Sequence, residues 1–288
     1  MRDKFVIDFF GLSEREARQQ FPAAYEHLLR TVKPVRDQNR RASYRDNWWV
    51  FGEPRRELRP SLEGLGQYIG TVDTAKHRVF QFLPIETLCD DGVVIVAIDD
   101  AFHLGVLQSA IHGEWCLRAG GTLEDRPRYN KSKIFDPFPF PSPTEGQRAA
   151  IAELAEELDA TRKAALAEVE RLTMTELYNW RERLRSGAPL DEKERRRASQ
   201  ARAGIVNRLH EQLDAAVADA YGWGAEWRMG ELGPSEIVAR LVALNQQRAA
   251  EEADGRIRWL RPEYQAPRFG GKGSGSIRTS TDPGSSPG

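Results

Sequence analysis

The pattern of hydrophobic and polar positions changes from strand-like to helical near Pro141. Before that point, Arg78–Leu83 alternates and predicts a strand with two unlike faces. Val93–Ile98 is a continuous β-branched run, which is typical of a strand buried on both faces. Ala101–Trp115 has helical spacing instead. We therefore expect a mostly stranded region from about Leu58 to Pro141, with one helical segment inside it.

After Pro141 the pattern predicts a series of helices. Thr144 and Gln147 have the spacing of a capping box, in which each side chain bonds the backbone of the other residue. Pro234-Ser235 opens the last predicted helix. The apolar positions of the first helix are Ile151, Leu154, Leu158, Ala165, Val169 and Leu172, and those of the second are Ile205, Leu209, Leu213 and Val217. Residues 269–288, rich in Gly, Ser, Thr and Pro, are predicted to form a disordered tail.

The N-terminal part has mixed character. Phe5–Phe10 is a strand-like apolar run. Ser13 and Glu16 then form a predicted capping box that opens a helical stretch, which Pro22 is expected to break or kink. Trp48-Trp49 stands beside Val50 and Phe51. Such a pair is most often part of a core, although stacking on a displaced base is the alternative.

These patterns together predict an α+β fold. A mixed β-sheet with packed helices is expected over residues 40 to 141, followed by an α-helical bundle to about residue 265. The predicted divisions are a connecting segment at 1–45, a sheet domain at 46–141 and a helical domain at 142–268.

Composition excludes some classes of protein. The 288-residue chain has 40% hydrophobic residues and seven tryptophans, enough for a packed core. Its formal net charge of −1 argues against binding through bulk positive charge, but permits one basic face. Cys89 and Cys116 have no close cysteine partner, which argues against a disulfide framework or a cysteine-only zinc site. The chain has no apolar run long enough for a signal peptide or a membrane span, so a cytoplasmic protein is expected.

The segment from Arg126 to Pro141 carries the most informative chemistry. A cationic stretch runs into alternating phenylalanines and prolines, which are expected to pin it to an apolar surface. In an extended strand Arg126 and Arg128 point to one face together with Glu124. Arginine pairs with guanine and glutamate accepts from cytosine, so these three residues are the candidates for DNA base readout. The alternative is an ordinary solvated hairpin.

Six further cations are candidates for contacts with the DNA backbone. They are Lys76, Arg78, Arg40, Arg41, Lys131 and Lys133. Arg78 has a structural pair with a carboxylate as its alternative, and Asp37 and Asp46 partly neutralise the segment around Arg40. Tyr129 and Lys131 would share the opposite face of the strand, where they contact the backbone or pack. The histidines at 77, 103 and 112 lie on separate predicted elements, which favours structural roles over a metal site.

Several blocks in chain order resemble the C-terminal half of the MmeI-like family of combined restriction-modification enzymes. The blocks are Val6–Gly11, Trp48–Arg55, Lys76–Phe80, Leu104–His112, Phe135–Pro141 and Arg258–Tyr264. The resemblance implies a target recognition domain at 46–141 and a C-terminal helical domain. In that family they follow an adenine-N6 methyltransferase domain of class I that uses S-adenosylmethionine.

The chain departs from the full family because its methyltransferase residues are absent. The Asn or Asp followed by Pro-Pro-Tyr or Pro-Pro-Phe is missing; Asp136-Pro137 comes nearest, but Phe138 replaces the second proline. Gly64-Leu-Gly66 is too sparse for a cofactor loop. We therefore expect no catalytic residue, no metal and no cofactor in this chain, with S-adenosylmethionine bound by a missing upstream domain.

The resulting hypothesis is a sequence-specific DNA recognition module of an adenine-N6 DNA methyltransferase or restriction-modification enzyme. It would be a fragment, a truncated product or a separately encoded module. Its expected partners are double-stranded DNA and an adenine methyltransferase domain or subunit. The alternatives are a helical interaction protein and a methyltransferase with an unrecognised site.

Overall fold

The computed structural model describes residues 5–123 and 126–270. Its contacts divide the chain into two compact units, Met1–Glu63 and Gly64–Gly288. The predicted tail from residue 271 onward lies outside the described residues. The domain divisions drawn from the sequence stay predictions.

The first unit is helical. Its helices are α1 (Glu14–Gln20), α2 (Pro22–Thr31), α3 (Lys33–Asp37), α4 (Ala42–Asp46) and α5 (Leu58–Leu62). Ser13 and Glu16 form the predicted capping box at α1, and the chain breaks between α1 and α2 at Phe21, just before Pro22. Both expectations are confirmed.

A small aromatic core holds this unit together. Phe9, Tyr25 and Trp48 are buried around Ala17, and the indole Nε1 of Trp49 donates to the carbonyl of Leu12 at 2.9 Å. The core interpretation of the tryptophan pair is therefore confirmed for Trp48, which is 4% exposed.

The predicted strand at Phe5–Phe10 is wrong. These residues have no strand conformation, and the described part of the first unit offers no neighbouring strand to pair with their backbone. Phe5 is 98% exposed, Ile7 is partly buried and packs against the aromatic core, and Phe9 is buried in it. An apolar run forms a strand only where a second strand satisfies its backbone N–H and C=O groups.

The second unit contains a three-stranded sheet. Strands β1 (Gln67–Val72), β2 (Gln81–Pro84) and β3 (Val93–Val96) pair in the order β2-β1-β3. Both pairings are antiparallel, so the sheet is not the mixed one that was expected, and it begins at Gln67 rather than near residue 40. The short loop at 73–80 explains the antiparallel pairing of β1 with β2, because parallel neighbours need a crossover of about a dozen residues or more.

The strand β3 and the helical segment after it differ from the prediction in detail. Three of the four β3 residues are only partly buried, whereas the sequence indicated burial on both faces. The segment Ala101–Trp115 forms two helices, α6 (Ala101–Gln108) and α7 (Ala110–Ala119), because Ser109 takes an extended conformation and caps α7. Its hydroxyl accepts from the backbone N–H of His112, a local bond that competes with helix continuation.

After α7 comes a hairpin of β4 (Gly121–Leu123) and β5 (Arg126–Arg128), followed by a short π-helix, η1 (Lys131–Phe135). The remaining helices are α8 (Glu145–Glu168), α9 (Met174–Ser186), α10 (Glu192–Gln200), α11 (Ala203–Ala220), α12 (Gly224–Met229), α13 (Pro234–Ala253) and α14 (Pro262–Phe269). Thr144 and Gln147 form the predicted capping box of α8. The antiparallel sheet and the many helices together confirm the α+β class.

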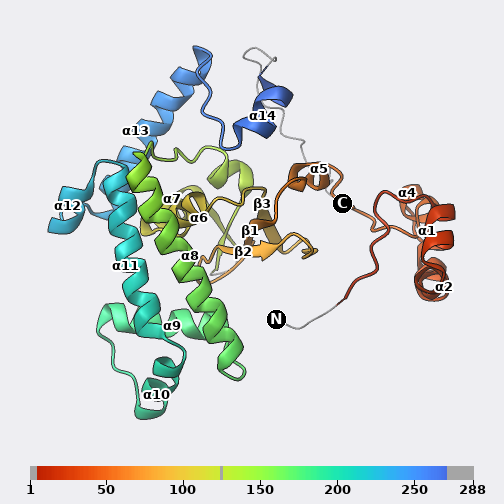
Figure 1. The fold of residues 1–288 in the computed structure, drawn as a ribbon, viewed down its shortest axis with the longest axis horizontal. Coiled ribbons are helices and arrows are strands. Elements are labelled where there is room, and N and C mark those ends of the chain that lie inside the picture. Colours follow the sequence, from red (N-terminus) through yellow and green to blue (C-terminus); the bar gives the residue numbers. More distant parts are fainter. Residues whose placement is uncertain (1–4, 124–125, 271–288) are drawn as a thin grey trace. The chain divides into compact units, whose positions relative to one another are not determined.

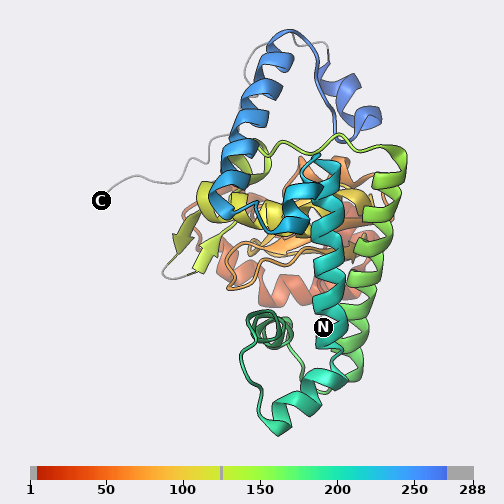
Figure 2. The same cartoon turned by 90° about the vertical axis from the view of Figure 1, so that its left-hand side faces the viewer.

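One hydrophobic core joins the sheet to the helices of this unit. It runs from Ile69 and Phe82 of the sheet through Leu107 of α6 to Leu158 of α8 and Leu213 of α11. The helices α8 and α11 lie side by side (Figures 1 and 2). Among the described residues, no helix is both long enough and apolar enough to cross a membrane.

Gly105 allows α6 to lie close against α8. A Cβ atom added at this position would stand 2.6 Å from Cγ2 of Ile151 and 3.2 Å from the backbone oxygen of the same residue. Since such distances are too short for carbon, a larger residue would force the two helices apart.

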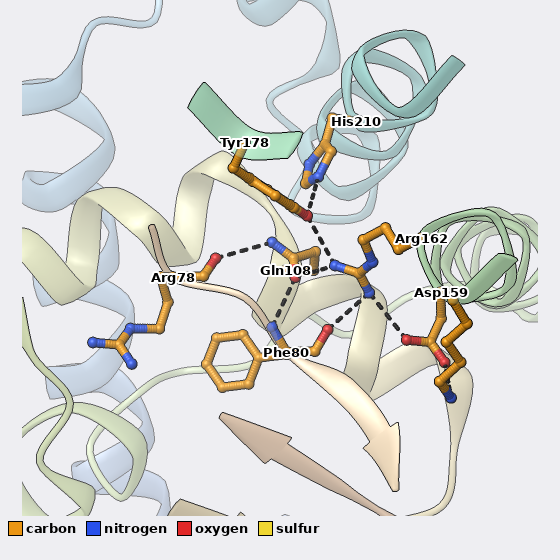
Figure 3. A network of polar contacts seen from close by, with 8 residues as sticks. Arg78, Phe80, Gln108, Asp159, Arg162, Tyr178 and His210 are labelled. Carbon is orange, nitrogen blue, oxygen red and sulfur yellow. Dashed lines mark hydrogen bonds and ion pairs between the residues drawn. The ribbon is translucent and has the colours of Figure 1, made fainter. Parts of the chain in front are cut away.

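A buried polar network also joins the helices to the segment before β2 (Figure 3). Arg162 of α8 is 1% exposed and donates to the carbonyl of Phe80 at 2.8 Å and to Oε1 of Gln108 at 2.9 Å. The same Gln108 oxygen accepts from the backbone N–H of Phe80 at 2.8 Å. Phe80 precedes β2, so these side chains satisfy backbone groups that the sheet leaves unpaired.

The network extends from Arg162 to α9 and α11. Its guanidinium also donates to the hydroxyl of Tyr178 at 2.9 Å and pairs with Asp159 at 3.2 Å. The Tyr178 oxygen lies 2.8 Å from Nε2 of His210. The sequence pattern did not indicate these residues, because a single arginine on an otherwise amphipathic helix carries no signal of burial.

Candidate nucleic-acid interface

The β4–β5 hairpin contains the residues that were predicted from the sequence to read DNA bases. Its strands pair Gly121 with Arg128 and Leu123 with Arg126. Glu124 lies outside the described residues. Arg126 begins β5, and the extended conformation predicted for its segment is confirmed. The base contacts of Glu124 and Arg126 stay predictions.

Main-chain contacts attach β5 to the loop between β1 and β2. Thr74 and Arg128 form an isolated antiparallel bridge, and the backbone N–H of Tyr129 donates to the carbonyl of Asp73 at 2.7 Å. The N–H of Ala75 reaches the carbonyl of Pro127 at 3.5 Å. The hairpin is therefore fixed to the sheet along its second strand.

The Arg78 side chain also helps to hold β5 against the sheet. Its guanidinium donates to the carbonyls of Val72, Asp73 and Pro127, the last at 3.0 Å, and lies 5.1 Å from the centre of the Tyr129 ring. Partial burial lowers the pKa of the Arg78 guanidinium. Figure 3 shows this guanidinium pointing away from Gln108, to which the Arg78 carbonyl is bonded.

The sequence predicted that Arg78 contacts the DNA backbone, but its guanidinium binds carbonyl oxygens of the protein itself. The side chain joins the end of β1 and Asp73 to β5 through carbonyl oxygens, and not through the carboxylate pair that was the structural alternative. The geometry favours a supporting role, and a phosphate contact of Arg78 stays a prediction.

Arg128 is held differently, at the exposed edge of the hairpin. Its Nε lies 3.0 and 3.3 Å from the two carboxylate oxygens of Asp73. The side chain is nevertheless 57% exposed. Within the part of the chain that the structure describes, the terminal amino groups of Arg128 make no hydrogen bond or ion pair. A guanidinium bound only through Nε keeps its two-pronged end available for another acceptor.

The cations after the hairpin lie on the π-helix. Lys131 pairs with Asp136 at 2.8 Å, and the side-chain oxygen of Asn130 accepts from the backbone N–H of Lys133 at 3.2 Å. The Lys133 ammonium is exposed and forms no ion pair with any described residue. Because the strand ends at Arg128, the predicted alternation that placed Lys131 opposite the arginines does not extend to it.

A packed aromatic cluster lies beneath the hairpin. Tyr129 is 1% exposed, so it packs, as one of its two predicted roles required. Its hydroxyl lies 3.3 Å from Nε2 of His112, whose Nδ1 donates to the Leu107 carbonyl at 2.7 Å. Burial lowers the pKa of His112 to about 3, and burial raises the pKa of the Cys116 thiol to about 12. Both groups are therefore neutral at ordinary pH, and the Arg78 guanidinium is the charged group beside them.

The other histidines also have structural neighbours. The ring of His103 lies 3.0 Å from a carboxylate oxygen of Asp100, and Nε2 of His77 lies 2.8 Å from Oδ1 of Asn179. Across residues 5–123 and 126–270, no three His, Cys, Asp or Glu side chains gather closely enough to hold a metal ion.

Lys76 borders a cleft of about 690 Å³ beside α9 and α10. Its ammonium lies 2.8 Å from Oδ1 of Asn179 and 3.4 Å from Glu182. Two other cations of the cleft are paired with carboxylates, Arg183 with Glu194 at 2.6 Å and Arg197 with Glu176 at 2.9 Å. The cleft therefore presents mixed charge, and a phosphate contact of Lys76 stays a prediction.

Arg40 and Arg41 belong to the first unit, and their predicted DNA contacts also stay predictions. Arg41 lies 3.6 Å from Glu53, with both side chains strongly exposed. Arg45 donates to the carbonyls of Asn39 and Arg40 and so fixes the backbone of this segment.

Comparison with known proteins gives one informative match. No protein-family model and no curated protein matches the chain. A solved structure of the Type IIL restriction-modification enzyme MmeI in complex with DNA is similar, with a TM-score of 0.61 and 19% sequence identity. The match covers 84% of this chain and 28% of that one.

The likeness is one of fold. The chain has a fold like that of part of a restriction-modification enzyme, and it spans 28% of the matched enzyme's length. The family-level expectation from the sequence is supported at this coarser level.

Proposed function

We propose that this chain is the sequence-recognition module of a restriction-modification system and that its β4–β5 hairpin reads base edges in duplex DNA. The proposal depends mainly on Arg128, whose exposed guanidinium is held through Nε while its terminal amino groups contact none of the described residues. This is the end of the side chain that pairs with guanine O6 and N7. Glu124 and Arg126 are proposed to read bases beside it.

The fold likeness supports this proposal, because the matched enzyme was solved in complex with DNA. The positions of Lys131 and Lys133 support it further. They follow the hairpin directly on η1, and the Lys133 ammonium is exposed. Lysines beside a base-reading strand supply phosphate contacts that position it without reading sequence. We propose the same phosphate role for Lys76, Arg40 and Arg41.

The chemistry is proposed to belong to an adenine-N6 methyltransferase domain or subunit that works with this chain. S-adenosylmethionine would be bound there. Isothermal titration of the 288-residue chain with S-adenosylmethionine should then show no heat of binding. A measurable heat would favour the rival function, a methyltransferase with an unrecognised site.

DNA recognition is tested by selecting duplexes from a randomised library with the 288-residue chain. We expect one short enriched sequence and an affinity that falls steeply with salt, because phosphate contacts release counterions. Arg128→Ala should relax the preference at one position by about tenfold, within the range of a lost bidentate contact.

Arg196→Ala is the matched control for that variant. Arg196 is an exposed arginine of α10 that pairs with Glu192, so its loss removes one positive charge and one surface ion pair. The control should leave base preference unchanged. A chain that enriches no sequence and binds DNA without salt dependence would contradict the proposed function.

A further inference from the structure

Asp73 lies where the sheet meets the hairpin, and it makes both main-chain and side-chain contacts there. Its N–H donates to the carbonyl of Gly92 at 2.8 Å, and its carbonyl accepts from the N–H of Tyr129 at 2.7 Å. These bonds connect residue 73 to Tyr129, which directly follows β5, and to Gly92 in the turn before β3. Its carboxylate is used separately, on Nε of Arg128.

The carboxylate contact limits how Arg128 can move. A free arginine side chain loses much of its rotamer entropy when it is fixed in one conformation. Asp73 removes part of this freedom before DNA arrives, since Nε of Arg128 is already held 3.0 Å from Oδ2. The aspartate side chain is only 25% exposed, so its own position is restricted by the loop.

A carboxylate at this surface also opposes DNA binding in general. Asp73 faces the same exposed edge as Arg128, and a negative charge there repels phosphates. An acidic group that weakens non-specific binding while it orients a base-reading arginine raises the ratio of specific to non-specific affinity on both counts.

We propose that Asp73 is a positioning residue that determines specificity by presetting the Arg128 guanidinium for base readout. This inference rests on the proposed function. It assigns to Asp73 no contact with DNA, because its carboxylate acts through Arg128.

The backbone geometry allows the side chain to be tested separately from the fold. The bonds of residue 73 to Gly92 and Tyr129 use main-chain atoms, and Arg78 binds the carbonyls of Asp73 and Pro127 independently of the Asp73 carboxylate. Asp73→Asn keeps the size of the side chain and all of these contacts. It removes the charge that holds Nε of Arg128.

The experiment compares affinity for the selected duplex with affinity for a scrambled duplex of the same length. Asp73→Asn should lower the ratio of the two affinities by about tenfold, within the range of a bidentate base contact. The affinity for the scrambled duplex should stay the same or rise, with a salt slope that is equal or steeper. A purely structural role would instead lower both affinities together.

Asp136→Asn is the matched control. Asp136 pairs with Lys131 at 2.8 Å, so this variant also removes a carboxylate from a cation that follows the hairpin. It should strengthen binding to both duplexes alike and leave their ratio unchanged, because Lys131 is proposed to touch phosphate only.

A double-mutant cycle shows whether Asp73 acts through Arg128. In an Arg128→Ala background, Asp73→Asn should have no further effect on the affinity ratio. An equal effect in both backgrounds would overturn the proposal. If Asp73→Asn does not fold, Asp73→Glu replaces it in the same cycle, with a smaller loss of the ratio expected because the carboxylate is kept but displaced.

The two proposals fail in distinguishable ways. If the wild-type chain selects no sequence, the proposed function fails. If the wild-type chain selects a sequence and Asp73→Asn keeps its full affinity ratio, only the role of Asp73 is overturned. Parallel losses of affinity for both duplexes, together with a lower melting temperature, would also overturn it.

Discussion

Arg162 in the helical core and Arg128 on the hairpin each pair with an aspartate, but they differ in whether the protein also binds their other guanidinium nitrogens. Both terminal nitrogens of Arg162 are bonded inside the protein, to Gln108, Tyr178, Phe80 and Asp159. The corresponding nitrogens of Arg128 make no such contact with the described residues, and its side chain is 57% exposed. The availability of an arginine for a ligand therefore depends on which of its N–H groups the protein already uses.

Arg78 lies between these two extremes and explains how the regions are connected. Its carbonyl belongs to the Arg162 network through Gln108, while its guanidinium binds the carbonyl of Pro127 in the hairpin. The buried network thus holds the segment that in turn supports β5. The difference between the two regions can be tested by removing a charge from each.

The largest expected effect comes from the buried arginine. Arg162→Met should destabilise the protein by about 3 kcal/mol or more, because it leaves Gln108, Phe80 and Tyr178 without their buried partner. Urea unfolding at neutral pH measures this loss. The exposed control Arg196→Met should change the free energy of unfolding by less than about 0.5 kcal/mol. Similar small losses for both variants would remove the distinction between the buried and the exposed arginine.

The hairpin region and the helical core also differ in how the stability of each depends on pH. His112 lies under the hairpin, and burial lowers its pKa from 6.5 to about 3. Asp214 of α11 accepts from the Ala110 N–H at 2.7 Å, and burial raises its pKa from 3.8 to about 6. The unfolded chain therefore binds more protons at His112, and the folded chain binds more at Asp214.

The two residues should make opposite contributions to acid stability. The contribution of His112 is complete above pH 6.5 and is lost as pH falls toward about 3. That of Asp214 is complete below pH 3.8 and is lost as pH rises through about 6.

Unfolding free energies at pH 7 and pH 5 test this. Between pH 7 and pH 5 the wild-type chain should lose about 2 kcal/mol of unfolding free energy through protonation of His112 in the unfolded state, at roughly 1.4 kcal/mol per pH unit below 6.5. The variant His112→Gln should not show this loss. Asp214→Asn should steepen the same loss, because the compensating proton uptake is gone. Slopes that match the wild type in both variants would contradict the assignment.

The smallest effect on stability is expected at the hairpin edge. Arg128→Ala should cost less than about 1 kcal/mol of unfolding free energy, because its pair with Asp73 is largely exposed. Its effect should appear in DNA binding instead. A loss of several kcal/mol by thermal or urea unfolding would show that Arg128, like Arg162, is mainly structural.

Lys133→Ala sharpens the distinction between base readout and phosphate contact. It should leave stability unchanged and weaken binding to selected and scrambled duplexes alike, with the salt slope reduced by about one. A change in base preference, measured by repeating the duplex selection, would instead place Lys133 among the residues that read sequence.

Local features of this chain could be predicted from sequence because they depend on neighbours within about one helical turn. The capping boxes of Ser13 with Glu16 and of Thr144 with Gln147 are of this kind, and both are present. The burial of Trp48 and the α+β class also follow from composition and periodicity, since they depend on how much apolar surface each segment must bury.

Only the tertiary structure determined which partner each of these charged side chains binds. Arg78 and Arg128 look alike in the sequence, but the carbonyl that binds Arg78 belongs to Pro127, and the carboxylate that binds Arg128 belongs to Asp73. The same holds for the missing strand at Phe5–Phe10 and for the buried Arg162. Strand pairing and ion pairing need partners that folding brings from distant parts of the chain, and no local pattern records where those partners will lie.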